Sequence, residues 1–120
     1  MNDNIINLDD ITNRKFDYKN LLNSTDSIIW NNCKNISIKI KSKINKLVLI
    51  NCENFKIRIG DTISGIDVEK SNNINIKILK NKNIKSLHCF KSNVKIELEK
   101  KIKNKLKFFS EKSKIILKYI

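Results

Sequence analysis

Apolar and polar residues alternate along most of this chain, in short runs separated by small polar turns. Residues 32–40 read Asn-Cys-Lys-Asn-Ile-Ser-Ile-Lys-Ile, and residues 51–59 read Asn-Cys-Glu-Asn-Phe-Lys-Ile-Arg-Ile. The phrase returns at residues 70–78 and, more loosely, at residues 90–98. An apolar period of two is typical of β-strands with one buried face, and it excludes a helical repeat. Each copy of the phrase therefore predicts a turn followed by a strand.

The spacing of the copies predicts how the strands are arranged. The last asparagine of each turn falls at Asn35, Asn54, Asn73 and Asn93, in steps of 19, 19 and 20 residues. A second alternation lies between the copies, at residues 47–50, 66–68, 84–87 and 106–109. Two short strands within about 20 residues form one closed turn of a coil, with strands stacked ~4.8 Å apart. The chain is therefore expected to be all-β, a parallel β-helix (solenoid) of about five rungs.

The first 25 residues do not fit this repeat. Leu8, Ile11, Tyr18, Leu21 and Leu22 are spaced roughly as on one face of a helix, and Asp9 and Asp10 would suit a helix N-terminus. A solenoid exposes strand edges at its ends, which an atypical terminal segment often covers. We expect a capping segment at residues 1–25 and the β-helix domain at residues 26–120.

The charge is the most conspicuous feature of the composition. The 120 residues include 25 basic and 12 acidic residues, a formal net charge of +13. Such a charge favours acidic partners, including nucleic acid and anionic membranes. Only Arg14 and Arg58 are arginine, however, and lysine, asparagine and isoleucine are the residues that an A+T-rich coding sequence over-produces. Nucleic-acid-binding faces usually interleave arginine with aromatic residues, so we expect no nucleic-acid partner.

The chemistry-bearing residues are few. Cys33 and Cys52 hold the same place in successive copies of the phrase, so they should stack near the interior, and Cys89 follows without a Cys-x-x-Cys pair. His88 is the only histidine, and its spacing from the cysteines fits no zinc site. We expect buried thiols in a reducing compartment, with no metal and no cofactor. The single tryptophan, Trp30, is expected in the core or the cap.

Two other absences bear on location and activity. The N-terminus lacks the basic and apolar regions of a signal peptide, and no run of 18 apolar residues occurs. No nucleophile–base pattern or glycine-rich loop is present. These features predict a cytoplasmic binding protein without membrane insertion, and not an enzyme.

The most specific phrase lies at the corner after residue 38. Lys39, Lys41 and Lys43 alternate there, and we expect them to form one outward row, because alternate residues of a strand share a face. This region of the chain, residues 28–78, resembles the C-terminal domain of cyclase-associated protein. The resemblance rests on Asn32-Cys33-Lys34-Asn35, on Ile40-Lys41-Ser42-Lys43-Ile44-Asn45-Lys46-Leu47, on Ile50-Asn51-Cys52-Glu53 and on Gly60-Asp61-Thr62-Ile63-Ser64.

The resemblance implies a fold, a partner and a set of contact residues. The fold would be a right-handed parallel β-helix. The partner would be monomeric actin, preferably in its ADP form, with promotion of nucleotide exchange and filament turnover. Lys39, Lys41 and Lys43 would contact actin, together with Lys56 and Arg58 one rung along. A homodimer is also implied, although the proline-containing tail through which the family dimerises has no counterpart in this sequence.

Two alternatives stay open. The β-helix of tubulin-folding cofactor C is similar at residues 63–69, which would imply a module that acts on small GTPases or tubulin. Members of that family that activate GTPases present an arginine where Lys85 stands here, and lysine lacks the planar fork of a guanidinium. The other alternative is a polyanion-binding solenoid, for which the lysines between Glu99 and Lys107 could hold phosphoinositide headgroups.

Overall fold

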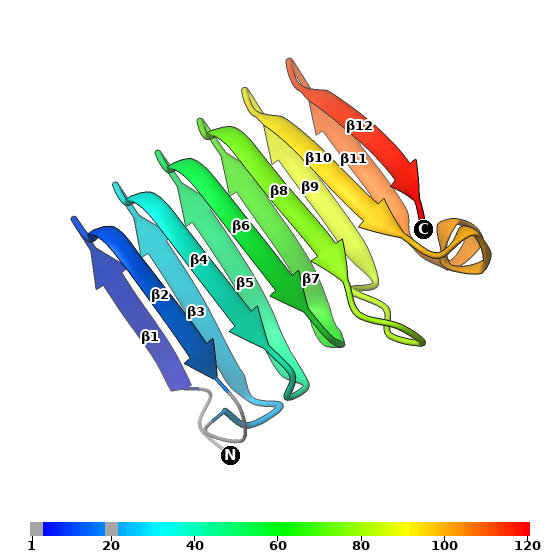
Figure 1. Ribbon diagram of the computed structural model, residues 1–120, viewed down its shortest axis with the longest axis horizontal. Coiled ribbons are helices and arrows are strands. Elements are labelled where there is room, and N and C mark those ends of the chain that lie inside the picture. Colours follow the sequence, from blue (N-terminus) through cyan, green and yellow to red (C-terminus); the bar gives the residue numbers. More distant parts are fainter. Residues whose placement is uncertain (1–3, 19–21) are drawn as a thin grey trace.

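Alternation of apolar and polar residues produces a coil of twelve short strands in the computed structural model, which describes residues 4–18 and 22–120. The chain runs along one side, turns a corner, runs along the other side, and repeats this course for six turns in a right-handed coil (Figure 1). All pairings between neighbouring strands are parallel, and each strand pairs with those two positions away in sequence. The predicted parallel β-helix is therefore confirmed, with six turns in place of about five.

The strands form two six-stranded sheets. The odd-strand sheet contains β1 (Asn4–Asp9), β3 (Asp26–Asn31), β5 (Ile44–Ile50), β7 (Thr62–Glu69), β9 (Ser86–Phe90) and β11 (Lys107–Glu111). The even-strand sheet contains β2 (Thr12–Tyr18), β4 (Lys34–Ile40), β6 (Glu53–Ile59), β8 (Asn72–Ile78), β10 (Asn93–Leu98) and β12 (Lys114–Tyr119). A 3₁₀ helix, η1 (Lys100–Lys105), connects β10 to β11.

The core lies between the two sheets and is filled by the inward residues of each strand. In β4, Ile36, Ile38 and Ile40 are buried, while the residues between them are not. Trp30 is fully buried and packs edge-to-face against Phe16 and Phe55, with ring centroids 4.9 and 5.6 Å apart. The expectation that Trp30 serves the core is confirmed.

The short corner, which joins each odd strand to the next even strand, explains the recurring phrase. It has two residues between the strands, and the first of them has a positive φ near 50°, as at Asn32 (58°) and Asn51 (54°). Asparagine tolerates this left-handed conformation better than most residues. The stacked amides also bond to one another: Nδ2 of Asn51 donates to Oδ1 of Asn32 at 3.1 Å.

A second asparagine ladder begins just after this corner. Asn35, Asn54 and Asn73 all have positive φ, and each side chain donates to the one in the turn before it. Asn93, which the sequence spacing aligned with them, instead donates to Asn72 at 2.9 Å. The fifth turn therefore lacks one residue at this point, because Val94 pairs directly with Ile74.

The expectation of a capping segment outside the coil at residues 1–25 is wrong for residues 4–18, the larger part of that segment that the structure describes. Residues 4–18 form β1 and β2, which pair in register with β3 and β4 and so make the first turn of the coil. The apparent helical spacing arose because Leu8 lies in β1 and Ile11 lies in the corner that follows, where the strand period is interrupted. Leu22 joins the core, whereas Leu21 lies outside the described residues.

Candidate functional site

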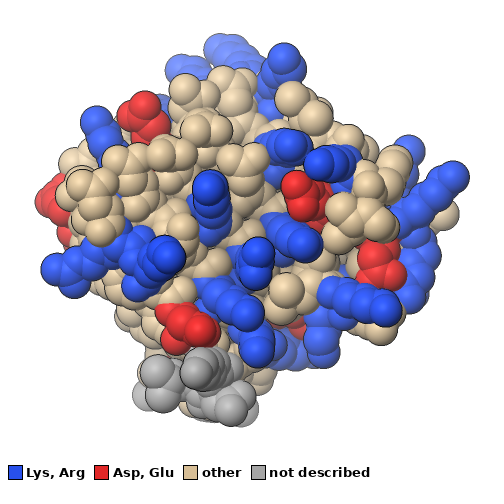
Figure 2. Space-filling view, viewed as in Figure 1, with Lys and Arg blue, Asp and Glu red and all other residues tan. Residues whose placement is uncertain are grey.

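The outward face of the even-strand sheet gathers basic side chains into rows. One outward position per strand gives Asp17, Lys39, Arg58, Lys77, Glu97 and Lys118, and the other gives Lys15, Ser37, Lys56, Asn75, Lys95 and Ile116. Lysine and arginine are spread across this side of the molecule, with few acidic residues among them (Figure 2).

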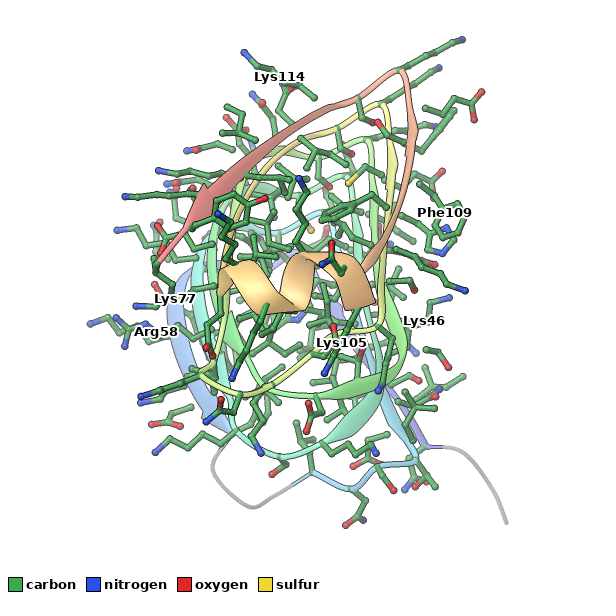
Figure 3. The ribbon with its side chains drawn as sticks, turned by 90° about the vertical axis from the view of Figure 1, so that its right-hand side faces the viewer. Lys46, Arg58, Lys77, Lys105, Phe109 and Lys114 are labelled. Carbon is green, nitrogen blue, oxygen red and sulfur yellow. The ribbon has the colours of Figure 1, made fainter. Side chains whose placement is uncertain are left out.

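Lys39, Arg58 and Lys77 form the centre of this face, and we call them the basic row. Lys39 lies directly opposite Arg58, and Arg58 directly opposite Lys77, on strands β4, β6 and β8. Parallel strands are ~4.8 Å apart, so three cations project side by side. Arg58 and Lys77 lie together on one flank of the coil (Figure 3). Lys56 lies beside Arg58 on the same strand face, as predicted.

Shallow hollows run between these side chains. One of about 440 Å³ is bordered by Lys15, Lys39, Lys56 and Arg58, with Ser37 among its lining residues. A second of about 350 Å³ continues past Lys77 toward Glu97. The face therefore has hollows about the size of a side chain, in which acidic side chains of a partner could lie between the lysine and arginine side chains.

The predicted single row of Lys39, Lys41 and Lys43 is wrong. Strand β4 ends at Ile40 and β5 begins at Ile44 in the other sheet, so the chain turns between Lys39 and Lys43. Alternate residues share a face only within a continuous strand, and the rule does not extend across a corner. Lys41 and Lys43 are exposed, but at the edge of the coil. Ser42 between them has no positive φ, so a serine is tolerated there.

Sequence reasoning missed Lys77, Lys15 and Lys95 on this face. The signal for Lys77 was present, because residues 39, 58 and 77 are separated by the 19-residue repeat. Lys15 was overlooked because residues 1–25 were assigned to a cap outside the coil. The signal for Lys95 was also present, because it stands two residues after Asn93, as Lys56 stands two residues after Asn54.

The three cations of the basic row repel one another without forming ion pairs among the described residues, although Asp17 lies opposite Lys39 at one end of the row and Glu97 lies opposite Lys77 at the other. The described residues form four ion pairs, Lys34–Glu53, Lys46–Asp67, Lys82–Asp61 and Lys101–Glu99, and none of them includes Lys39, Arg58 or Lys77. Like charges directly opposite one another on neighbouring strands are destabilising. An acidic surface placed against this face would relieve that repulsion.

The cysteines lie inside the coil and away from this face. Cys33 and Cys52 occupy the same corner position in successive turns and are buried, as predicted. Burial raises the pKa of the Cys52 thiol and that of the Cys89 thiol to about 11. Both thiols therefore stay protonated at neutral pH, and a protonated thiol is a poor nucleophile and metal ligand.

The remaining candidates are separated in space from the basic row. Lys85 is an exposed residue with φ 71° at the corner between β8 and β9. The stretch from Glu99 to Lys107, whose lysines were considered for phosphoinositide headgroups, contains η1, and Ile102 of this helix is buried. Within residues 4–18 and 22–120, no helix has both the length and the apolar character required to cross a bilayer.

Comparison with known proteins bears on the family. The model of the family described as adenylate cyclase associated (CAP) C terminal matches residues 11–117. The crystal structure of cyclase-associated protein from Cryptosporidium parvum is similar, with a TM-score of 0.71 and 20% identity. That likeness covers 97% of this chain and 63% of the other, so the chain spans less than two thirds of that protein. Comparison with curated protein sequences found no match.

The family match extends well beyond residues 28–78, on which the sequence resemblance rested. It includes the first corner, at Ile11, and reaches Leu117 in the last strand. The described residues form six turns of one parallel β-helix, and the similar crystal structure shares this fold over 97% of the chain. This chain belongs to the family of the cyclase-associated protein C-terminal domain.

Proposed function

We propose that this chain binds actin monomers through the outward face of the even-strand sheet. The observation that carries the proposal is the basic row Lys39–Arg58–Lys77, which presents three cations from adjacent strands without ion-pair partners among the described residues. Family membership supports actin as the partner. Lys56 belongs to the same contact surface, with Lys41 and Lys43 at its margin.

Actin is acidic, so charge complementarity favours this face. Charges on an interface rim mainly accelerate the encounter and fix the register of docking, and contribute less to affinity. The β-helix suits this role because strand pairing holds the side chains at fixed spacing, which reduces the ordering required on binding.

We further propose that the chain prefers ADP-actin and accelerates nucleotide exchange. A ligand shifts an equilibrium only by its differential affinity for the two states. Faster exchange therefore requires that the chain bind more tightly to an actin conformation from which nucleotide dissociates easily. On this proposal the chain acts as a cytoplasmic binding module and not as an enzyme. The homodimer that the family implies stays a prediction, which sedimentation of the free chain would test.

The test is binding to monomeric actin in its ADP and ATP forms at physiological salt. The wild type should bind ADP-actin more tightly than ATP-actin. The variant Lys39→Ala/Arg58→Ala/Lys77→Ala should weaken binding by roughly tenfold, since each rim charge contributes up to ~1 kcal/mol. A variant of equal charge, Lys100→Ala/Lys103→Ala/Lys105→Ala, alters exposed residues of η1 and serves as the control.

The comparison also separates the strand face from its margin. Lys41→Ala/Lys43→Ala should weaken binding less than the loss of the basic row. An equal loss in the η1 control would indicate a nonspecific effect of net charge. Absence of binding to both actin forms by a folded wild type would refute the proposal.

A further inference from the structure

The outward face of the odd-strand sheet has the opposite character from the basic face. Phe109 and Lys46 project on the flank opposite Arg58 and Lys77 (Figure 3). Near β7, β9 and β11 this face contains a groove of about 570 Å³. Six outward residues line it in two rows of three: Asp67, His88 and Phe109, and then Glu69, Phe90 and Glu111.

The floor of the groove is aromatic and accessible. The rings of His88 and Phe109 are stacked, with centroids 4.4 Å apart and an interplanar angle of 12°. Phe109 remains 49% exposed, and Phe90 is half-buried beside it. Exposed aromatic side chains gathered in a concave surface are typical of contact sites, because they bring large apolar area at low entropic cost.

The rim of the groove indicates what could cover this floor. Glu69 and Glu111 are exposed and lie on either side of Phe90 in one row, so their strands are about 10 Å apart. Neither glutamate takes part in the ion pairs of the described residues, whereas Asp67 pairs with Lys46 at 2.8 Å. Two free carboxylates beside aromatic rings are unusual on a chain with net charge +13.

An internal contact illustrates the chemistry of this rim. The Nζ atom of Lys91 lies 5.2 Å from the centroid of the Phe90 ring, in the row between Glu69 and Glu111. The ring of Phe90 thus already accepts an ammonium group over its face. Guanidinium groups stack on aromatic rings more readily than ammonium groups and also pair with carboxylates.

We propose that this groove docks an extended segment of a partner protein that presents two arginines flanking an aliphatic residue. The arginines would pair with Glu69 and Glu111 and stack on Phe90 or Phe109, and the aliphatic side chain would cover the floor. A second copy of this chain fits less well, since two chains of charge +13 repel each other. The site lies on the sheet opposite the basic row, so it is independent of actin binding and could be occupied at the same time.

The test is a titration of the ¹⁵N-labelled chain, followed by amide chemical shifts, with the peptide acetyl-Ser-Arg-Leu-Arg-Ser-amide. The shifts should move at Glu69, Phe90 and Phe109 and stay fixed at Lys39, Arg58 and Lys77. The peptide acetyl-Ser-Glu-Leu-Glu-Ser-amide should produce no change in the groove. Replacement of both arginines by lysine should weaken binding at least threefold.

Two variants test the rim and the floor separately. Glu69→Gln/Glu111→Gln should weaken binding of the arginine peptide at least fivefold. Phe109→Ser leaves the net charge unchanged and should also weaken binding of this peptide at least fivefold. Glu97→Gln/Glu53→Gln removes two carboxylates elsewhere and should leave binding unchanged. Any of three results would overturn the proposal: shifts centred on the basic row, equal binding by the acidic peptide, or undiminished binding by both groove variants. Concentration-dependent shifts at the groove without peptide would instead assign it to self-association and equally overturn the proposal.

Discussion

At the scale of single residues, small side chains with polar Sγ or Oγ atoms stack in a column on the inner side of the short corner. The inward position there holds Cys33, Cys52, Ser71, Ser92 and Ser113 in successive turns, and the first four are buried. The Oγ atom of Ser71 accepts a hydrogen bond from the backbone N–H of Cys52 at 3.0 Å. In the next turns, Ser92 accepts from the N–H of Ser71, and Ser113 accepts from the N–H of Ser92. Each hydroxyl also donates to the carbonyl oxygen two residues before it. The column satisfies backbone groups that a tight corner would otherwise bury without partners.

This column makes a prediction for Ser92→Ala. The change leaves the N–H of buried Ser71 without its acceptor, and an unsatisfied buried donor costs about 1–3 kcal/mol. Urea unfolding should show that loss of stability. Ser113→Ala removes the same kind of bond at a half-exposed position, where water can replace the hydroxyl, so it should cost less than about 1 kcal/mol. Equal losses for both variants would contradict this explanation.

At the scale of elements, β7 departs from the regular strand. Thr62 pairs with Ile44 but Gly65 pairs with Lys46, so β7 contains one extra residue and bulges. Gly65 has φ 89°, and its N–H donates to Oγ1 of Thr62 at 3.0 Å. A Cβ atom at Gly65 would lie 2.5 Å from the carbonyl oxygen of Ser86 and even closer to its Oγ. The bulge thus lets β7 approach β9 closely, and restores the register from Ile66 onward.

Gly65→Ala should therefore destabilise the chain by about 2–4 kcal/mol, from an unfavourable φ combined with a backbone clash. Thermal or urea unfolding would measure the change. Gly60→Ala is the matched control, because its Cβ would meet the nearest atom, the carbonyl oxygen of Lys41, at 3.1 Å and the backbone is not left-handed. A loss at position 60 as large as that at position 65 would show that the bulge has no special role.

At the scale of the whole molecule, the two sheets present surfaces of different character. The even-strand sheet carries the basic row, and the odd-strand sheet carries the acidic and aromatic groove. The molecule measures only 30 × 28 × 24 Å, so its excess of positive charge is confined to a small volume. Repulsion within one molecule opposes the compact state.

This repulsion predicts that salt stabilises the folded chain. Raising NaCl from 10 to 300 mM should increase the free energy of unfolding in urea by about 1 kcal/mol, because screening weakens repulsion between exposed lysines. The variant Lys100→Glu/Lys103→Glu reverses two charges on the exposed side of η1 and should respond less to salt. A decrease in stability with salt would mean that the four ion pairs outweigh the net charge.

The sequence by itself determined the class of fold and the chemistry of the repeat. An apolar period of two and a 19-residue step leave few arrangements besides a stacked coil, because each strand must bury one face and pair with its neighbours. The same regularity placed Cys33 above Cys52 and put Lys56 beside Arg58, since those residues lie within unbroken copies of the phrase.

Only the tertiary structure decided what lies where the repeat is interrupted. It showed that residues 4–18 form the first turn, although their spacing resembles a helix, because pairing with β3 and β4 outweighs a weak local pattern. It also separated Lys39 from Lys43 and joined Lys39 with Lys77, 38 residues away, on one face. Faces of a solenoid are made from residues one full turn apart, and their alignment depends on the length of every corner between them. A single missing residue near Asn93, or an extra one in β7, changes which residues of successive turns stand opposite one another. The local sequence does not show whether such a change falls before or after the corner.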